Sequence, residues 1–225
     1  MNGILLVDKP IGWTSHDVVA KVRGMIKSET GQKVKIGHTG TLDPAAAGLM
    51  ILVLGSYTKR AGEFSKLDKS YEAELTLGKV SSTGDSEGEI TDQSDKKPTL
   101  AEIENVIGTF TGQIEQVPPA HSAIKINGQR AYKLARKGQK PALEPRKVTV
   151  YEISVLSYNY PKLQIKTHVG SGTYIRSLAA DIGEKLCTGA YLSALCRTSV
   201  GEFNLEDALE VSNLTPDKIS LALQK

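Results

Sequence analysis

The spacing of hydrophobic and polar positions changes several times along the chain, and each change predicts a new element. Residues 4–7 and 49–54 are continuous apolar runs, which is typical of buried strands. Residues 70–77 instead alternate apolar with polar side chains, which predicts a strand with one buried face. Runs of the same kind over residues 148–156 and 163–169 predict two neighbouring strands.

Other segments carry apolar residues at three-to-four spacing, which predicts helices. One covers residues 15–26, with Thr14 or Ser15 as its N-cap. Another runs from Thr99 to residue 110, and Glu102 three residues after Thr99 forms the pattern of a capping box. Further helices are predicted over residues 57–67, 174–186 and 205–211, whereas residues 191–203 have a mixed pattern.

The number and order of these elements predict the fold class. Strands are more numerous than a simple alternation of strand and helix would give, and several follow one another directly. We therefore expect an α+β (mixed α/β) fold in which helices flank a central, largely antiparallel sheet. We expect residues 1–225 to form a single domain, and residues 84–89, which are polar and acidic, to form a solvated loop.

Composition excludes several classes of protein. A content of 40% hydrophobic and 24% charged residues is ordinary for a folded globular chain of 225 residues. The two cysteines form neither a Cys-x-x-Cys pair nor a cluster with histidines, which argues against a disulfide scaffold or a zinc site. No signal peptide or membrane-spanning stretch is recognisable, so we expect a cytoplasmic protein.

Positive charge is concentrated in residues 121–147. This stretch contains eight basic residues and one acidic residue, a net charge of +7 in a chain whose total is +3. A solvated helix face usually mixes both signs, so this imbalance favours a surface that binds a phosphate backbone. A plain solvated segment remains the alternative. The basic residues are Lys125, Arg130, Lys133, Arg136, Lys137, Lys140, Arg146 and Lys147.

Two further segments could carry chemistry. In the run GHTGTLDP over residues 37–44, two glycines allow tight backbone geometry, and Pro44 keeps Asp43 out of a helix. Asp43 is therefore expected on an ordered loop, either as a turn residue or as a catalytic carboxylate. Arg176 is expected in the first turn of the helix over residues 174–186, where a cation opposes the positive helix end. It should therefore have an anionic partner: Asp181, another surface acid, or a buried carboxylate such as Asp43.

Taken together, these segments resemble the TruB family, the tRNA pseudouridine-55 synthases. Any one matching segment would be weak, but seven in the family's order are specific. They cover residues 3–15, 37–44, 69–73, 117–125, 128–132 with 135–136, 172–183, and finally 195 with 197–198 and 201–203.

The resemblance implies a role for each matching residue. Asp43 would be the catalytic carboxylate, Arg176 would pair with it, and Tyr71 would stack on the target base. His38 would enter the space that the flipped nucleotide leaves. The remaining candidates would bind RNA or line the pocket, with Leu195 in its apolar wall: Lys9, Lys125, Tyr174, Leu195, Arg130 and Arg136.

The resemblance also implies the reaction and the partners. Isomerising uridine breaks the N-glycosidic bond and rejoins the base through carbon, without redox change, so no cofactor or metal is expected. The partner would be the T arm of tRNA, and the protein would act as a monomer without membrane or obligate protein partner. Family members usually carry a further C-terminal, PUA-like RNA-binding module, which we expect to be absent here.

Two other functions stay open at this point. One is a guide-RNA-dependent pseudouridine synthase with the same core, and the other is a tRNA-folding factor without catalysis. The chemical route is open as well. The carboxylate could attack C1′ of the sugar, attack C6 of the uracil, or remove the C2′ proton to give a glycal.

Overall fold

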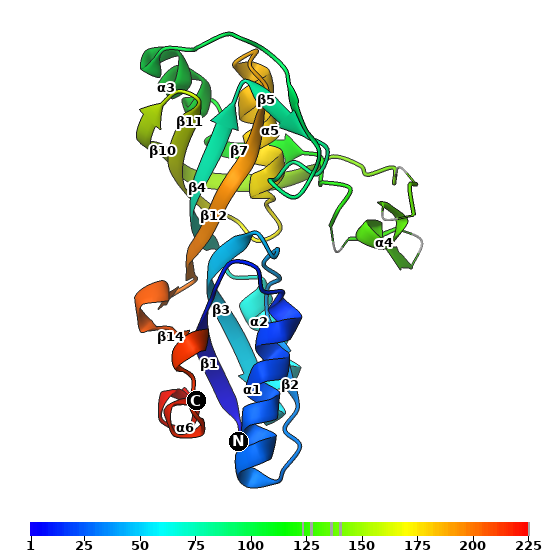
Figure 1. Cartoon of the computed structure of the whole chain (residues 1–225), viewed down its shortest axis with the longest axis vertical. Coiled ribbons are helices and arrows are strands. Elements are labelled where there is room, and N and C mark those ends of the chain that lie inside the picture. Colours follow the sequence, from blue (N-terminus) through cyan, green and yellow to red (C-terminus); the bar gives the residue numbers. More distant parts are fainter. Residues whose placement is uncertain (123, 127, 136, 140, 225) are drawn as a thin grey trace. The chain divides into compact units, whose positions relative to one another are not determined.

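The computed structural model describes residues 1–122, 124–126, 128–135, 137–139 and 141–224. Contacts divide the chain into two compact units, which are described separately below. Unit 1 comprises Met1–Tyr71 with Leu195–Lys225, and unit 2 comprises Glu72–Ala194. The strands β4 (Lys69–Leu77) and β12 (Ala190–Val200) each contribute residues to both units (Figure 1).

Unit 1 is built on β3 (Ala46–Leu54), which has strand partners on both edges. β1 (Gly3–Lys9) pairs antiparallel with β3 from Gly3 opposite Leu54 to Lys9 opposite Gly48, and β2 (Ile36–His38) pairs antiparallel with β3 on the other edge. The further elements of unit 1 are α1 (Ser15–Thr30), η1 (Gly55–Arg60), α2 (Ala61–Ser65), β13 (Phe203–Asn204), η2 (Leu205–Asp207), β14 (Leu209–Glu210), η3 (Val211–Asn213) and α6 (Pro216–Ala222).

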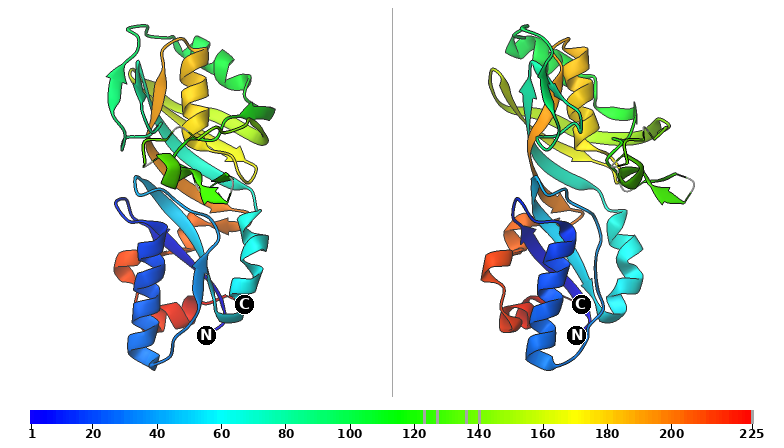
Figure 2. Two further views of the ribbon diagram at one scale, coloured as in Figure 1. Left: turned by 90° about the vertical axis from the view of Figure 1, so that its right-hand side faces the viewer. Right: turned by 45° about the vertical axis from the view of Figure 1, so that its right-hand side comes forward.

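The core of unit 1 follows from its apolar runs. β1 and β3 are buried along most of their lengths, in agreement with the continuous apolar runs of their sequences. Helix α1 buries one stripe, which contains Val18, Val22 and Ile26, and Figure 2 shows it alongside the β1 and β3 strands. Thr14 is its N-cap and forms a capping box with Asp17.

Unit 2 is a sheet in the order β12-β4-β11-β10-β7. β10 (Arg146–Asn159) runs antiparallel to both β11 (Lys162–Val169) and β7 (Gly112–Gln116). Along β11 every second residue is buried, so one face of the strand packs on the core and the other is exposed. Its further elements are β5 (Lys79–Ser81), β6 (Ile90–Asp92), α3 (Leu100–Gly108), β8 (Lys125–Ile126), β9 (Gln129–Arg130), α4 (Ala131–Ala135) and α5 (Ile175–Lys185).

The predicted mixed α/β class with a largely antiparallel sheet is confirmed: β1–β3, β2–β3, β10–β11, β10–β7 and β12–β13 pair antiparallel, whereas β1–β14 and β12–β3 pair parallel. The capping box of α3 at Thr99 and Glu102 is also confirmed. In these described parts of the chain, no helix is long and apolar enough to cross a membrane.

Two predictions of secondary structure need correction, and one segment left undecided by the sequence is now assigned. Residues 205–211 do not form a terminal helix, because Leu209 and Glu210 pair with β1 as β14; the last helix is α6. The helix predicted over residues 57–67 is divided into η1 and α2. The mixed pattern over residues 191–203 is mostly the long strand β12, whose apolar and polar positions reflect changing neighbours along its length.

Candidate active site

Asp43 lies on a loop between β2 and β3 in unit 1 and is half-buried. Its carbonyl accepts a hydrogen bond from the Ala46 amide at 3.0 Å, which closes a turn at the start of β3. The Ser15 hydroxyl fixes Leu42, the residue before Asp43. It donates to the Leu42 carbonyl at 3.0 Å and accepts from the Leu42 amide at 2.8 Å. The Gly12 amide donates to the Pro44 carbonyl at 2.8 Å. The expectation of an ordered loop is thus confirmed.

Lys9, at the end of β1, is fully buried in the same unit. Its Nζ donates to the carbonyls of Pro10 at 3.0 Å and Trp13 at 2.7 Å, so it ties down the loop that precedes α1. Burial lowers the pKa of Lys9, and the negative charge of Asp43 offsets part of that lowering. Lys9 and Asp43 therefore interact electrostatically, as expected for residues of one site.

Two more cations are buried in unit 1. Arg197, on β12, is 2% exposed and donates from Nε to the Leu49 carbonyl at 2.7 Å. Lys69, at the start of β4, donates to the Ser65 carbonyl at 3.1 Å and also to the Leu67 carbonyl. Burial, together with the charge of Arg197, lowers the pKa of Lys69 to about 8. Both residues stand in motifs that match the family, but the sequence indicated no role for either.

Tyr71, Leu195 and His38 also belong to unit 1. Tyr71 is buried on β4, in the alternating pattern that its sequence predicts. Leu195 is half-buried and pairs across the strands with Ala46, three residues after Asp43. His38 ends β2 and pairs with Leu52 of β3. These three residues therefore share unit 1 with Lys9 and Asp43, while their roles toward a nucleotide stay predictions.

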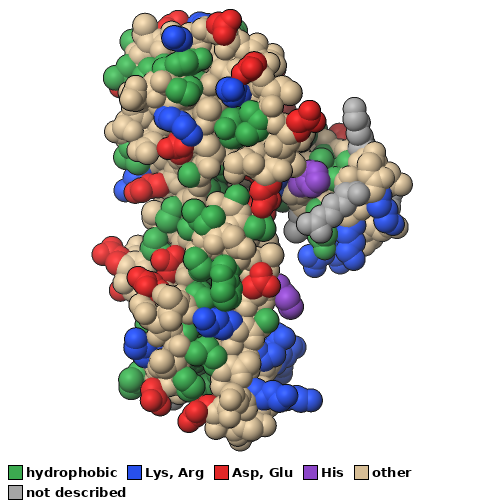
Figure 3. Space-filling view, in the orientation of Figure 1, with side chains coloured by type: hydrophobic (Ala, Val, Ile, Leu, Met, Phe, Trp, Pro, Cys, Tyr) green, Lys and Arg blue, Asp and Glu red, His purple; other side chains and the backbone are tan. Residues whose placement is uncertain are grey.

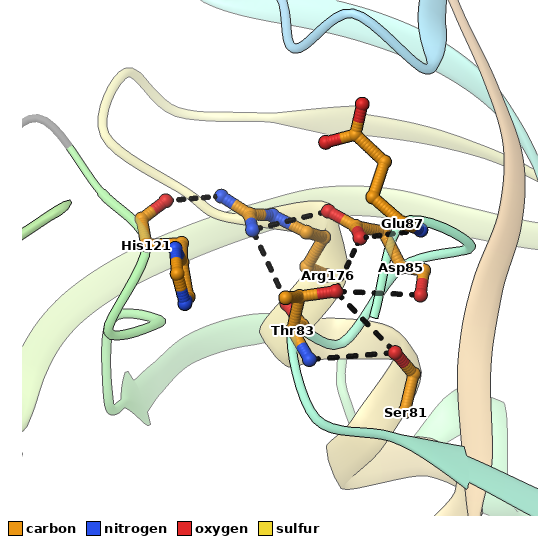
Figure 4. A network of polar contacts seen from close by, with 6 residues as sticks. All are labelled: Ser81, Thr83, Asp85, Glu87, His121 and Arg176. Atoms are coloured by element: carbon orange, nitrogen blue, oxygen red, sulfur yellow. Dashed lines mark hydrogen bonds and ion pairs between the residues drawn. The ribbon is translucent and has the colours of Figure 1, made fainter. Parts of the chain in front are cut away.

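Arg176 lies in the first turn of α5 in unit 2 and is buried, with 7% of the residue exposed. Its guanidinium donates to Asp85 Oδ2 at 3.1 Å, to the Thr83 carbonyl at 3.2 Å and to the His121 carbonyl at 2.6 Å (Figure 4). Arg176 therefore has the expected anionic partner, which is the buried carboxylate of Asp85. The pairing of Arg176 with Asp43 stays a prediction.

The prediction of a solvated loop over residues 84–89 is wrong for Asp85, which is buried. Asp85 Oδ1 accepts hydrogen bonds from the Thr83 hydroxyl and from the Glu87 amide, the latter at 3.1 Å, so the loop folds around its carboxylate (Figure 4). Gly84, with a φ of +77°, allows the sharp turn. An acid that follows Thr and Gly in a tight turn is the local signal that could have indicated an ordered carboxylate. Its partner could not be predicted locally, because Arg176 on α5 is 91 residues away.

The other candidates of unit 2 lie around the start of α5 and in the basic stretch. Tyr174 is the N-cap of α5, and both its amide and its carbonyl bind the side chain of Gln116, at 2.8 and 3.1 Å. Lys125 and Arg130 are exposed and face each other across the β8–β9 hairpin. Arg136 lies outside the described residues. Figure 3 shows Lys and Arg side chains on the surface of the segment that carries α4.

A family model described as the N-terminal domain of TruB family pseudouridylate synthases matches residues 27–175. The tRNA pseudouridine synthase B of Bacteroides fragilis is 44% identical over 209 residues, which cover 92% of this chain and 90% of the relative. The enzyme of the same name from Phocaeicola vulgatus is 45% identical over 212 residues, covering 93% and 90%. The chain belongs to the TruB family.

A solved structure agrees with the TruB-family assignment. A chain in the crystal structure of a Cbf5-Nop10-Gar1 complex is 30% identical and superposes with a TM-score of 0.73. The match covers 94% of this chain and 53% of that chain, so the TruB-family chain spans about half of that protein. A relative from Dechloromonas aromatica is also longer: its match is 42% identical and covers 95% of this chain but 70% of the relative.

Proposed function

We propose that this protein isomerises the uridine at position 55, in the T loop of tRNA, to pseudouridine, with Asp43 as the catalytic carboxylate. The observation that carries the proposal is the identity of 44% to a tRNA pseudouridine synthase B over 92% of the chain. The geometry of the Asp43 loop supports it. Asp43 is only partly buried, and its loop is held by Ser15 and Gly12, which fixes the backbone that presents the carboxylate.

The surroundings of Asp43 fit a reaction that begins with a carboxylate. Burial lowers the pKa of Lys9, and attraction to the charge of Asp43 offsets part of that lowering, so a charged Lys9 favours a charged carboxylate beside it. An ionised Asp43 can attack C1′ or C6, or it can remove the C2′ proton. All three routes remain part of the proposal.

The proposal assigns the rest of the site by family resemblance. Tyr71 stacks on the target base, Leu195 contributes apolar wall, and His38 fills the space left by the extruded nucleotide. By the same resemblance, Arg176 pairs with Asp43. Extruding a base from its stack costs a few kcal/mol, which stacking on an aromatic side chain and phosphate contacts offset.

Exposed cations supply the phosphate contacts in this proposal. Lys125 and Arg130 face each other on the β8–β9 hairpin, and the basic stretch that contains them holds a net charge of +7. On unit 1, Arg23, Lys27, Lys33 and Lys35 are exposed on α1 and on the segment that leads into β2, where Figure 3 shows further basic side chains. Such surfaces fit the backbone of RNA.

The decisive experiment uses purified protein and unmodified tRNA transcript, without guide RNA or a second protein. Pseudouridine mapped only to position 55 supports the proposal. A requirement for a guide RNA would favour the Cbf5-like alternative, and tight tRNA binding without any product would favour a folding factor. Size-exclusion chromatography of the active protein tests the proposed monomer.

Substitution of Asp43 tests the assignment of the catalyst. Asp43→Asn removes the charge with little change of shape, so we expect turnover to fall at least ~1000-fold while the Kd for tRNA stays within about twofold. Asp95→Asn, an exposed aspartate, is the matched control and should behave as the wild type. Lys125→Ala combined with Arg130→Ala should do the opposite, raising Kd roughly tenfold at unchanged saturated rate. Weak tRNA binding by Asp43→Asn would overturn its catalytic assignment.

A further inference from the structure

Arg197 is a buried cation that stands directly beside the strand carrying the Asp43 loop. β12 runs parallel to β3 in unit 1, and Arg197 pairs with Gly48, the third residue of β3. Only 2% of the residue is exposed, so its guanidinium cannot serve as a surface contact for RNA. Its role must lie inside unit 1.

The guanidinium binds the backbone on both sides of Asp43. Nε donates to the Leu49 carbonyl at 2.7 Å, and Nη2 donates to the Gly40 carbonyl at 3.2 Å. Gly40 precedes Asp43 by three residues and Leu49 follows it by six. One planar, rigid side chain therefore bridges the two ends of the segment that presents Asp43.

Two glycines make room for this bridge. A Cβ on Gly40 would lie 3.2 Å from Nη1 of Arg197, tighter than an ordinary van der Waals contact. Gly48 has a φ of +104°, and a Cβ there would lie 2.4 Å from the Arg197 carbonyl. The glycines therefore allow β12 and its arginine to approach the Asp43 segment closely.

The charge of Arg197 is costly where it lies. Among the ion pairs between described residues, none includes Arg197, Lys9 or Lys69. Burial is the main cause that lowers the pKa values of Lys9 and Lys69, and the charge of Arg197 lowers both further, which reports repulsion between Arg197 and each lysine. A buried arginine whose two hydrogen bonds both go to main-chain carbonyls is better explained by what it positions.

We propose that Arg197 is a positioning residue that holds the catalytic loop in its reactive geometry by joining the Gly40 and Leu49 carbonyls. This inference rests on the proposed function, because it takes Asp43 as the catalyst. It concerns the chemical step alone: Arg197 touches neither the RNA nor the reacting atoms. Its loss lets the Asp43 carboxylate move relative to a correctly bound nucleotide.

The first test replaces Arg197 and separates chemistry from binding. Arg197→Met keeps length and burial but provides no donor, so the single-turnover rate at saturating tRNA should fall about 100-fold. The Kd for tRNA should stay within about twofold, because no RNA contact is lost. Arg197→Lys can bind one carbonyl but cannot bridge two, so it should recover part of the rate, to roughly tenfold below the wild type.

The second test changes the bridge while keeping Arg197. Gly40→Ala places a methyl group against the guanidinium and meets nothing else closer than 3.8 Å. It should therefore lower the single-turnover rate without unfolding the protein, as thermal melting checks. The matched control is Gly24→Ala on α1, where a Cβ meets nothing within 4 Å, and this variant should keep the wild-type rate.

The outcomes distinguish this inference from the proposed function. If wild-type protein forms no pseudouridine, the proposed function fails and Arg197 has no catalytic loop to position. If wild type is active and folded Arg197→Met keeps its saturated rate, only the inference on Arg197 fails. It also fails if Kd rises in proportion to the loss of rate, or if Gly40→Ala is as active as Gly24→Ala.

Discussion

The two units each bury an arginine, and the two arginines are balanced in different ways. Arg176 in unit 2 binds the carboxylate of Asp85 and two carbonyls, whereas Arg197 in unit 1 donates to two backbone carbonyls, those of Leu49 and Gly40. The first is an ion pair that fixes a loop through charge. The second is a backbone bridge, and among the ion pairs between described residues none includes Arg197.

The other buried ionisable groups also differ in charge between the two units. Unit 1 adds two buried cations, Lys9 and Lys69, whose pKa values are lowered. Unit 2 adds a carboxyl of opposite character, because burial and the charge of Glu184 raise the pKa of Asp181 to about 6. An excess of buried positive charge in unit 1 suits a site built around one reactive carboxylate and an anionic substrate. Lys69 in unit 1 and Asp181 in unit 2 should therefore contribute to the pH dependence of stability with opposite signs.

The largest expected effect comes from breaking the ion pair of unit 2. Asp85→Asn leaves the Arg176 cation buried without its partner, so the free energy of unfolding should fall by about 3 kcal/mol in urea titrations. Asp92→Asn is the matched control, since its ion pair with Lys79 lies at the surface and should contribute little. If both variants were equally stable, the Asp85 pair would not organise unit 2.

A smaller effect should appear in unit 1 at alkaline pH. Lys69 has a pKa of about 8 in the folded protein against 10.5 for the ordinary side chain. Between these values the unfolded chain binds more protons, so the free energy of unfolding should rise with pH from about 8 to about 10.5. Lys69→Met should remove part of this rise in unfolding titrations at several pH values. The exposed control Lys66→Met should retain it, and equal slopes in both variants would contradict burial of a charged Lys69.

The smallest effect should be the opposite trend in unit 2 at acidic pH. Asp181 has a pKa of about 6 in the fold against 3.8 for the ordinary carboxyl, so the folded protein binds the extra proton between these values. Stability from this group is present below pH 3.8 and is lost as the pH rises through 6. Asp181→Asn should flatten that decline in thermal melts, whereas Glu104→Gln on the exposed side of α3 should not. A steeper decline in Asp181→Asn would show that its ionised form stabilises unit 2.

Many features of the fold could be predicted because their causes are local. The capping box at Thr99 and Glu102 and the alternation in β4 depend on residues within a few positions of one another. The loop around Asp43 was predictable in the same way, since the nearby glycines allow tight turns and Pro44 disfavours a helix at Asp43. The N-cap of α1 was only narrowed to Thr14 or Ser15. The structure assigns it to Thr14, while Ser15 binds Leu42, 27 residues away.

The sequence by itself therefore determined the hydrophobic periodicity of each main element, the fold class and the residues that resemble a TruB-family site. Tertiary structure alone decided which charges are buried and what they bind. Asp85 reads as a solvated acid until α5, 91 residues later, brings Arg176 to it. Arg197 has no visible role until strand pairing places it beside Gly40, 157 residues earlier. The physical reason is that periodicity and capping act over one or two turns, whereas burial of a charge depends on which distant strands and helices pack around it.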